Sequence, residues 1–479
     1  MKTFILYFFL PGILLLARPV AYGQQIIASD AVSIKSAKSK IFPFSGPSAN
    51  YVAIKEKSSV ILLHYDTAFK LQEKVARDLD DVLNSDVLVG AAQTGSIVTF
   101  LLSDKKQNHF STLIYQTDGH FRPGINFDMD DHMYLNWIAQ NGYLAVLAVK
   151  KKSSILSLLI LDSSGIRTKQ VFDLSKENFM TFQKTTLYDV FSDHLLKHIQ
   201  PGAYQSDLSA PYLCKMYYTE SELSLTLDVR SITTQVIRLN LKSGSYKNDI
   251  VPFAQNKSQA GDGVDGNSFL AGHHLATAFI YPRGMSVGIY DLDSSRYLAE
   301  WCSCSSSWDS LVSSPLQNAN MVTGDITSIP KKEKFLNKIY GTSLLSIAMN
   351  EMPDGSIELY AGGLEKISTG GGGGVMIMSG GGMGGGVPMM MPTGSSAGDD
   401  GDIESSVKRH YYFWSALSMP LLKKTERSKT GELYSKFIDD YYGRLYGDPH
   451  KNVCQFNFGT HFYIGFYNPE RSILNISKY

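Results

Sequence analysis

Hydrophobic residues along the chain recur in short runs that are separated by polar turns. Ser59 to Tyr65 is one such run and ends at Asp66, and Tyr143 to Val149 is followed by Ile155 to Leu161. These runs are rich in β-branched and aromatic residues and are bounded by Asp, Ser or Gly, which is typical of strands joined as hairpins. The pattern predicts a mainly all-β protein. Further runs of this kind are Tyr51 to Ile54, Val87 to Ala92, Ser96 to Leu102, Ser111 to Gln116, Leu223 to Asp228, Gln235 to Leu241, Leu275 to Tyr281 and Ser286 to Tyr290.

The turns that close these units recur at Asp66, Asp118, Asp162, Ser243 and Asp293, at intervals of about 52, 44, 81 and 50 residues. A period of roughly 45 to 50 residues with several strands per unit is typical of β-propeller blades. In this spacing the chain resembles secreted β-propeller-like proteins with degenerate blades, which implies about six or seven blades. The long interval predicts one blade plus an insertion.

Two helices are expected outside the strand pattern. The insertion, residues 173–209, is expected to be helical around Leu187 to Ile199. Residues 431–446 carry apolar side chains at steps of four, which predicts a surface helix packed on the ring. These apolar residues are Leu433, Phe437, Tyr441 and Leu445.

The two ends of the chain both predict strands. Ser472 to Ile476 is the last hydrophobic run, and Ile26 to Ile34 is the candidate partner near the start. Propellers often pair strands from both termini, because this closes the ring and removes an exposed strand edge. We therefore expect residues 24–479 to form a single β-propeller-like domain.

The first 23 residues predict a secretory signal peptide. Lys2 precedes an apolar run from Phe4 to Ala17, and Ala21 and Gly23 supply the small residues at a cleavage site. A retained anchor is the alternative, but about 14 apolar residues fall short of the roughly 20 needed to cross a bilayer. We expect export to the periplasm or the extracellular space, with no transmembrane segment in the mature chain.

Composition narrows the classes of partner. The chain is 43% hydrophobic and 11% aromatic, enough for a buried core, and its formal net charge is zero. A balanced charge argues against nucleic acid, which requires a basic surface. Nucleotide binding is not expected either, because the glycine-rich segment is not followed by Lys-Ser or Lys-Thr.

Residues 369–401 form a glycine- and methionine-rich stretch that is expected to be a flexible loop inserted in the domain. Thioethers are soft ligands, so Met376, Met378 and Met383 are candidate ligands of monovalent copper. A partner-binding loop and an inert insertion are the alternatives.

Acidic residues gather in one short segment. Asp128, Asp130, Asp131 and His132 lie within five residues and are candidate ligands of a hard cation such as calcium, if the segment is a loop between blades. A solvated acidic turn is the alternative.

Two histidine pairs carry weaker expectations. His194 and His198 are four apart and are expected on one face of a surface helix, without the glutamate that a zinc hydrolase needs. His273 and His274 are adjacent, so on a strand they would point to opposite faces and would not serve one site together.

The four cysteines leave the disulfide pattern open. Cys302 and Cys304 are separated by one residue and are expected to be too close to bridge each other comfortably, whereas pairing with Cys214 and Cys454 is open. Free buried thiols and a soft-metal site are the alternatives.

These features favour a non-catalytic binding or scaffold protein that engages a protein or glycan through loops on one face of the ring. The first alternative is a glycan-directed hydrolase or lyase with carboxylates near the channel, drawn from separate blades. Candidate acids of this kind are Asp66, Asp118, Asp130, Asp162 and Asp293, although a turn aspartate usually serves the backbone. The second alternative is copper handling by the methionine-rich loop.

Overall fold

The computed structural model describes residues 25–479 with internal gaps. The gaps are residues 35–38, 47–48, 84, 117–118, 141–142, 163–164, 180–184, 200–210, 220, 230–231, 254–264, 283, 321–322, 324, 353, 367–406, 420–421, 428–431, 433–436, 438–452 and 459–460. The leader at residues 1–23 and the loop at residues 369–401, with Met376, Met378 and Met383, therefore lie outside the described residues.

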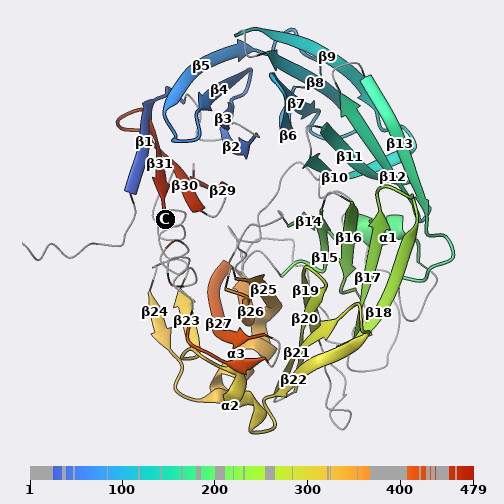
Figure 1. The fold of residues 1–479 in the computed structure, drawn as a ribbon, viewed down its shortest axis with the longest axis vertical. Helices are drawn as coiled ribbons and strands as arrows, with labels where there is room; N and C mark the ends of the chain where they lie inside the picture. Colours follow the sequence, from blue (N-terminus) through green and yellow to red (C-terminus); the bar gives the residue numbers. More distant parts are fainter. Residues whose placement is uncertain are drawn as a thin grey trace, which may run out of the picture.

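The described strands form seven sheets arranged around a common centre (Figure 1). The predicted β-propeller-like fold is confirmed, at the upper end of the expected number of blades. Numbered from the N-terminus, blade 1 is β2 to β5, blade 2 is β6 to β9, blade 3 is β10 to β13, blade 4 is β14 to β18, blade 5 is β19 to β22, blade 6 is β23 to β28, and blade 7 is β29 to β31 with β1.

Each blade presents one strand toward the centre of the ring (Figure 1). The innermost strands are β2 (Lys40–Ser45), β6 (Val87–Thr94), β10 (His132–Gln140), β14 (Leu196–His198), β19 (Asp265–Ala271), β25 (Ser343–Glu351) and β29 (Val453–Phe458). The second strands are β3 (Asn50–Lys55), β7 (Ile97–Ser103), β11 (Tyr143–Lys150), β15 (Cys214–Tyr218), β20 (His274–Tyr281), β26 (Ser356–Lys366) and β30 (His461–Asn468). The third strands are β4 (Ser59–Tyr65), β8 (His109–Gln116), β12 (Ile155–Asp162), β16 (Glu222–Leu227), β21 (Gly284–Asp291), β27 (Val407–Ser418) and β31 (Ile473–Lys478).

The outer strands complete the blades. The fourth strands are β5 (Leu71–Asp78), β9 (Phe121–Asp128), β13 (Gly165–Asp173), β17 (Thr233–Asn240), β22 (Arg296–Cys302), β23 (Gln317–Asn320) and β1 (Gln25–Ala31). Blades 4 and 6 add a fifth strand, β18 (Tyr246–Pro252) and β24 (Ile326–Ser328), and the short β28 (Lys423–Lys424) pairs with β27.

The two ends of the described chain meet in blade 7. Strand β1 pairs antiparallel with β31, with Gln25 opposite Lys478 and Ala31 opposite Ile473. Ala28 and Val32 are buried in the same apolar cluster as Leu474 and Ile476. The predicted pairing of terminal strands is confirmed, and it covers the edge that β31 would otherwise expose.

The hydrophobic core lies between neighbouring blades. Second and third strands are buried on both faces, so they read in the sequence as continuous apolar runs. One cluster joins Leu62 of blade 1 to Phe100 of blade 2, and another joins Leu158 of blade 3 to Leu225 of blade 4. The blades are held face to face by this packing, since each buried apolar side chain contributes about 1.5 to 3 kcal/mol.

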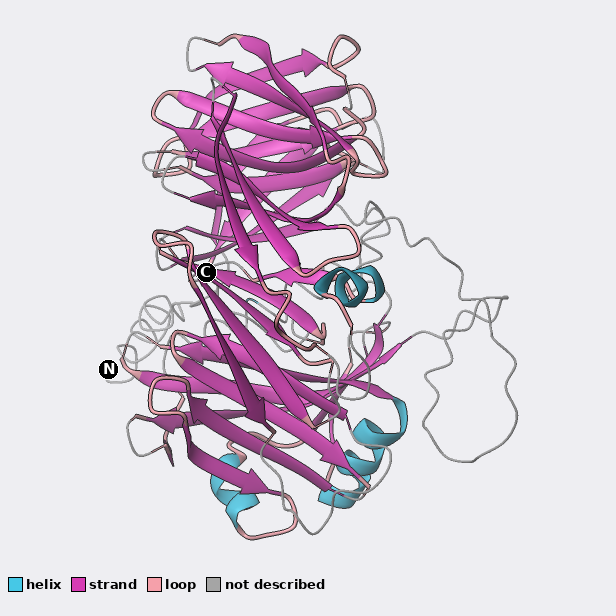
Figure 2. Ribbon diagram, turned by 90° about the vertical axis from the view of Figure 1, so that its right-hand side faces the viewer, coloured by secondary structure: helices cyan, strands magenta, loops and turns pink. Residues whose placement is uncertain are grey.

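Three helices are described, and they lie at the margins of a molecule that is otherwise made of strands (Figure 2). Helix α1 (Leu187–Asp193) begins at a capping box between Thr186 and Asp189. Helix α2 (Ser307–Leu311) connects blades 5 and 6, and helix α3 (Lys332–Thr342) lies between β24 and β25 of blade 6. No helix in the described part of the chain is long and apolar enough to cross a membrane.

The helical expectations are met in part. The insertion contains α1, but the helix ends at Asp193 and the chain continues as strand β14, so the prediction of one helix up to Ile199 was too long. Of residues 431–446, the structure describes Glu432 and Phe437 in helical conformation. Phe437 is buried against Phe462 and Tyr479, which agrees with a helix packed on the ring.

A buried ion pair links blades 4, 5 and 6. Lys215 Nζ donates to Asp228 Oδ2 at 3.1 Å and to Asn267 Oδ1 at 2.8 Å, and both side chains of the pair are 0% exposed. Asn267 Nδ2 in turn donates to the carbonyl oxygen of Leu345 at 2.9 Å. Asp228 also accepts hydrogen bonds from the backbone N–H and the hydroxyl of Ser268. Polar side chains therefore fix the alignment of three consecutive blades.

Candidate functional site

Aromatic side chains from separate blades meet on the innermost strands. Phe42 of β2 lies with its ring centre 5.5 Å from that of Trp137 of β10, and Trp137 lies 5.8 Å from His198 of β14. The His198 ring is 5.2 Å from that of Tyr218, at the end of β15. All four residues are partly exposed to solvent. We call Phe42, Trp137, His198 and Tyr218 the inner aromatic cluster.

Trp137 reaches blade 1 by crossing the innermost strand of blade 2. A Cβ atom placed on Gly90 of β6 would lie 2.4 Å from Cδ2 of the Trp137 ring, far inside van der Waals contact. Glycine is therefore required at this position, because only a residue without a side chain lets an indole lie flat against the strand. The cluster thus spans four consecutive blades, and in blade 2 the Trp137 ring packs against Gly90.

Two hydrogen bonds fix the cluster between blades 3 and 4. Asn136 Nδ2 donates to the carbonyl oxygen of Leu196 at 3.0 Å, and the Tyr218 hydroxyl donates to the carbonyl oxygen of Ala139 at 3.0 Å. Burial of the imidazole lowers the pKa of His198 to about 4, so this ring is neutral at pH 7. The inner aromatic cluster is therefore an uncharged and rigidly held surface.

Carboxylates are sparse on the innermost strands. In the described innermost strands, the acidic residues are Asp265, which begins β19, and Glu351, which ends β25. Asp265 accepts a hydrogen bond from the backbone of Leu345. Leu345 and Glu351 are six positions apart along β25, so the backbone positions beside the two carboxylates lie about 20 Å apart at 3.3 Å per residue. Paired-carboxylate glycoside hydrolysis requires roughly 5 to 10 Å.

The acidic segment before β10 does lie between two blades, as the cation hypothesis required. The structure gives its members separate histidine partners: Asp128 Oδ1 lies 2.6 Å from His109 Nδ1, and Asp131 Oδ1 lies 2.5 Å from His132 Nδ1. Asp130 is exposed, and its backbone carbonyl accepts from Lys151. Each described carboxylate is thus explained by an ion pair or by solvation, and a calcium site remains a prediction.

A different group of side chains that could ligate a metal ion lies in the turns of blade 5. Donor atoms of His273, Asp291 and Asp293 all lie within 4.8 Å of one another. The chain itself supplies partners: Asp291 caps the turn by accepting from Asp293 N and from Ser294, and Arg238 Nη1 lies 3.5 Å from Asp293 Oδ1. A guanidinium beside the carboxylates provides the positive charge that a metal would otherwise bring.

The prediction that His194 and His198 share a helical face was wrong. His194 caps the end of α1 in extended conformation and His198 lies in strand β14, so the two do not share a helical face. His273 lies in the turn before β20, not in the strand, and its ring centre is 4.0 Å from that of His274. His274 Nδ1 contacts Glu351 Oε1 at 3.0 Å. The error came from extending the helix past its end at Asp193, and strand β20 begins at His274, one residue after His273.

Of the candidate acids at hairpin turns, Asp66 serves the backbone and Asp293 pairs with Arg238. Asp66 Oδ1 accepts from the backbone N–H groups of Ala68 and Lys70, both at 2.9 Å. Asp118 lies outside the described residues, and Asp162 ends strand β12. Turn aspartates at Asp66 and Asp293 are therefore accounted for by local structure.

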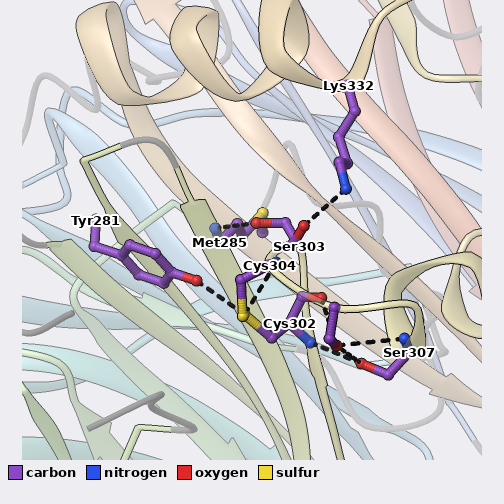
Figure 3. The surroundings of a disulfide bond; sticks show 8 residues. Tyr281, Met285, Cys302, Ser303, Cys304, Ser307 and Lys332 are labelled. Atoms are coloured by element: carbon purple, nitrogen blue, oxygen red, sulfur yellow. Dashed lines mark hydrogen bonds between the residues drawn. A yellow bond between two sulfur atoms is a disulfide. The ribbon is translucent and has the colours of Figure 1, made fainter. Parts of the chain in front are cut away.

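The cysteine expectation was also wrong. Cys302 and Cys304 form a disulfide with each other, with 5.1 Å between their Cα atoms (Figure 3). Cys214 and Cys454 are free. A turn directly after β22 brings the two sulfur atoms together, although one residue lies between the cysteines.

The inner aromatic cluster was missed in the sequence analysis. Phe42, Trp137 and Tyr218 are isolated aromatic residues that the hydrophobic pattern does not single out, His198 was assigned to a helix, and their meeting depends on how the blades pack. The sequence did contain a weak signal for Trp137. It is one of four tryptophans, and it lies in the stretch that begins directly after the acidic turn.

Comparisons with known proteins give structural similarity alone. No protein-family model matches the chain, and no curated protein matches its sequence. The solved β-propeller domain of Nup133 from Vanderwaltozyma polyspora is similar at a TM-score of 0.33 and 9% identity, over 92% of this chain and 100% of that chain. A subtype N10 neuraminidase-like protein of A/little yellow-shouldered bat/Guatemala is similar at a TM-score of 0.30 and 8% identity, over 71% of this chain and 95% of that chain.

An ACO/RPE65 chimera is similar at a TM-score of 0.30 and 11% identity. The alignment covers 59% of this chain and 62% of the length of the chimera. Such distant likenesses agree with the fold and carry no function. The propeller-like architecture rests on the seven sheets of the chain itself.

Proposed function

We propose that this protein is a non-catalytic binding protein that holds a glycan against its inner aromatic cluster. The observation that carries the proposal is the meeting of Phe42, Trp137, His198 and Tyr218 on the central side of consecutive blades, all partly exposed. Partly exposed aromatic rings present a large apolar face at little conformational cost, and binding sites are rich in them.

A glycan suits this surface better than a protein ligand. The C–H faces of a sugar ring pack flat on an indole or phenol ring, and neutral aromatic walls do not require a charged partner. Phe42, Trp137 and His198 lie on innermost strands, so the cluster favours a slender chain that can enter the ring. A folded protein partner would instead engage the hairpin loops at one face.

The separation of the carboxylates argues against the hydrolase or lyase alternative for the described innermost strands. The backbone positions beside Asp265 and Glu351 lie about 20 Å apart, counted along β25 at 3.3 Å per residue. No step of glycoside cleavage can use two acids at that distance. The described innermost strands therefore offer no acid pair at the spacing that glycoside cleavage requires.

The test is titration of the full chain with a panel of soluble oligosaccharides, followed by tryptophan fluorescence and by calorimetry. Trp137→Ala is expected to weaken binding at least tenfold. Trp414→Ala is the matched control, because Trp414 is also partly exposed but lies in blade 6. Equal losses in both variants, or binding that survives Trp137→Ala, would refute the assignment. Binding of proteins but of no glycan would favour the loop-binding alternative.

We also propose that the mature protein works outside the cytoplasm. The leader-like sequence at residues 1–23 supports this, and so does the disulfide, because such bonds persist in oxidising compartments. Expression of the full chain in a secreting host, with mass spectrometry of the product, is expected to give an N-terminus at Gln24. A product retained inside the cell with residues 1–23 intact would contradict export.

A further inference from the structure

The Cys302–Cys304 disulfide lies at the surface of the turn between strand β22 and helix α2 (Figure 3). Cys304 is exposed and Cys302 is partly buried, so the two sulfurs are not equivalent toward a reagent from solvent. Ser303, the residue between them, is buried.

This disulfide adds little to the fold. Stabilisation by a disulfide grows with the length of the loop that it closes, and here the loop contains one intervening residue. Hydrogen bonds hold the turn independently: Ser303 N donates to the carbonyl oxygen of Met285, and Met285 N donates to Ser303 Oγ, both at 2.9 Å. Ser305 N donates to the carbonyl oxygen of Cys302 at 3.1 Å. The backbone of the turn is therefore expected to persist when the disulfide is reduced.

Donors gather around one of the two sulfurs. Tyr281 donates its hydroxyl hydrogen to Cys302 Sγ at 3.0 Å, and the backbone N–H of Cys304 lies 3.1 Å from the same sulfur (Figure 3). Burial raises the pKa of Tyr281, so its hydroxyl remains a donor at neutral pH. Lys332 brings an ammonium group to the same turn, where Nζ donates to the carbonyl oxygen of Ser303 at 2.7 Å. These groups would stabilise a thiolate on Cys302.

We propose that Cys302 and Cys304 form a thiol–disulfide exchange site, with Cys304 as the sulfur that is attacked and Cys302 as the leaving thiolate. A thiolate from the substrate attacks Cys304 Sγ, the Sγ–Sγ bond breaks, and its electron pair remains on Cys302. The result is a mixed disulfide between the substrate and Cys304. The function is separate from glycan binding, since the pair lies at the outer strand of blade 5.

The substrate class is an accessible dithiol, or two molecules of a small thiol. A second thiolate of the substrate attacks its own sulfur in the mixed disulfide and releases Cys304 as a thiolate. The substrate is thereby oxidised to a disulfide by two electrons, and the Cys302–Cys304 pair is reduced by the same two. The protons of the substrate thiols pass to solvent and to the two cysteine thiolates as pH dictates.

Two variants of the full chain, each with one cysteine of the pair replaced, test the direction of attack, with oxidised glutathione as the probe. In Cys302→Ser the exposed Cys304 thiolate attacks glutathione disulfide, and the mixed disulfide accumulates because no neighbouring thiolate resolves it. Cys304→Ser leaves the partly buried sulfur and is expected to react at least tenfold more slowly. Equal rates, or faster reaction of Cys304→Ser, would overturn the assignment.

The remaining cysteines do not obscure this test. Burial raises the pKa of the Cys214 thiol, and burial of its thiol raises the pKa of Cys454 to about 12, although the residue as a whole is only partly buried. Both thiols are therefore protonated and slow near neutral pH. Peptide mass spectrometry assigns the glutathione to its cysteine.

The Tyr281→Phe variant tests the role of the Tyr281 hydroxyl as a hydrogen-bond donor to Cys302. The measurement is the rate at which reduced glutathione opens the disulfide in the folded protein. Losing one hydrogen bond to the leaving thiolate is expected to slow reduction about tenfold. Tyr65→Phe is the control, because Tyr65 also donates a buried hydroxyl hydrogen, to Asp30, in a distant part of the ring. Reduction only in denaturant, or a lower unfolding midpoint after reduction, would show a structural bond and refute the proposal.

Discussion

Replacing Lys215 by methionine tests how the blades are joined. The ammonium group of Lys215 is 0% exposed and contacts Asp228 Oδ2 at 3.1 Å and Asn267 Oδ1 at 2.8 Å. Burial lowers the pKa of Lys215, while the nearby Asp228 charge opposes that shift and favours the charged form. Lys215→Met therefore leaves Asp228 as a buried carboxylate, with Ser268 as its remaining donor among the described residues.

The expected cost of Lys215→Met is about 3 to 5 kcal/mol in the free energy of unfolding, which is typical when one partner of a buried pair is removed. Most of this cost belongs to the charge left behind. The double variant Lys215→Met, Asp228→Asn is therefore expected to be more stable than Lys215→Met alone.

Equilibrium urea unfolding, followed by circular dichroism and tryptophan fluorescence, measures these free energies. Lys247→Met is the matched control, because Lys247 pairs with Asp249 at 3.0 Å but is 55% exposed. We expect this control to change the free energy of unfolding by less than about 1 kcal/mol. A Lys215→Met protein as stable as the control would refute the buried network between blades.

Three further predictions follow from the ring and its inner wall. Gly90→Ala is expected to cost about 1 to 3 kcal/mol in the free energy of unfolding and to weaken glycan binding, because its Cβ would displace the Trp137 ring. Urea unfolding measures the first effect, and titration with the oligosaccharide measures the second. The pKa of His198 is about 4 when folded and about 6.5 when unfolded, so its contribution to stability is complete above pH 6.5 and is lost as pH falls to 4. Partial exposure limits this loss to about 1 to 2 kcal/mol. The free energy of unfolding of wild type and of His198→Gln is measured at pH 7 and pH 4.5, and wild type is expected to lose more of it at the lower pH. Deleting residues 24–34 removes β1 and exposes the edge of β31, so size-exclusion chromatography is expected to show association that wild type lacks.

The sequence predicted the middle strands of the blades well. Strands such as β4 and β12 are buried on both faces and read as apolar runs, and the predicted bounds of β4 match the structure. Outer strands such as β5 alternate half-buried and exposed positions and contain charged residues, so their runs did not stand out. The blade count was within range because each blade has similar length.

The site could not be predicted, because its parts come from different blades. Phe42 and Trp137 are 95 positions apart in the sequence, and their contact depends on the order of blades around the ring and on Gly90. The Lys215–Asp228 pair could not be predicted for a related reason. A lysine within an apolar run indicates the end of a buried strand unless its buried partners are known. Boundary residues such as His198 were misassigned because a helix and a strand meet within three positions.

Hydroxyl-radical footprinting of the side chains, with and without the oligosaccharide that binds, tests the central claim most directly. Trp137 and Tyr218 are partly exposed and are expected to oxidise readily in the free protein. Bound glycan should slow their oxidation several-fold and leave that of Trp414, in blade 6, unchanged. Unchanged oxidation of Trp137 in the saturated complex, or protection confined to the hairpin loops, would contradict binding at the inner aromatic cluster.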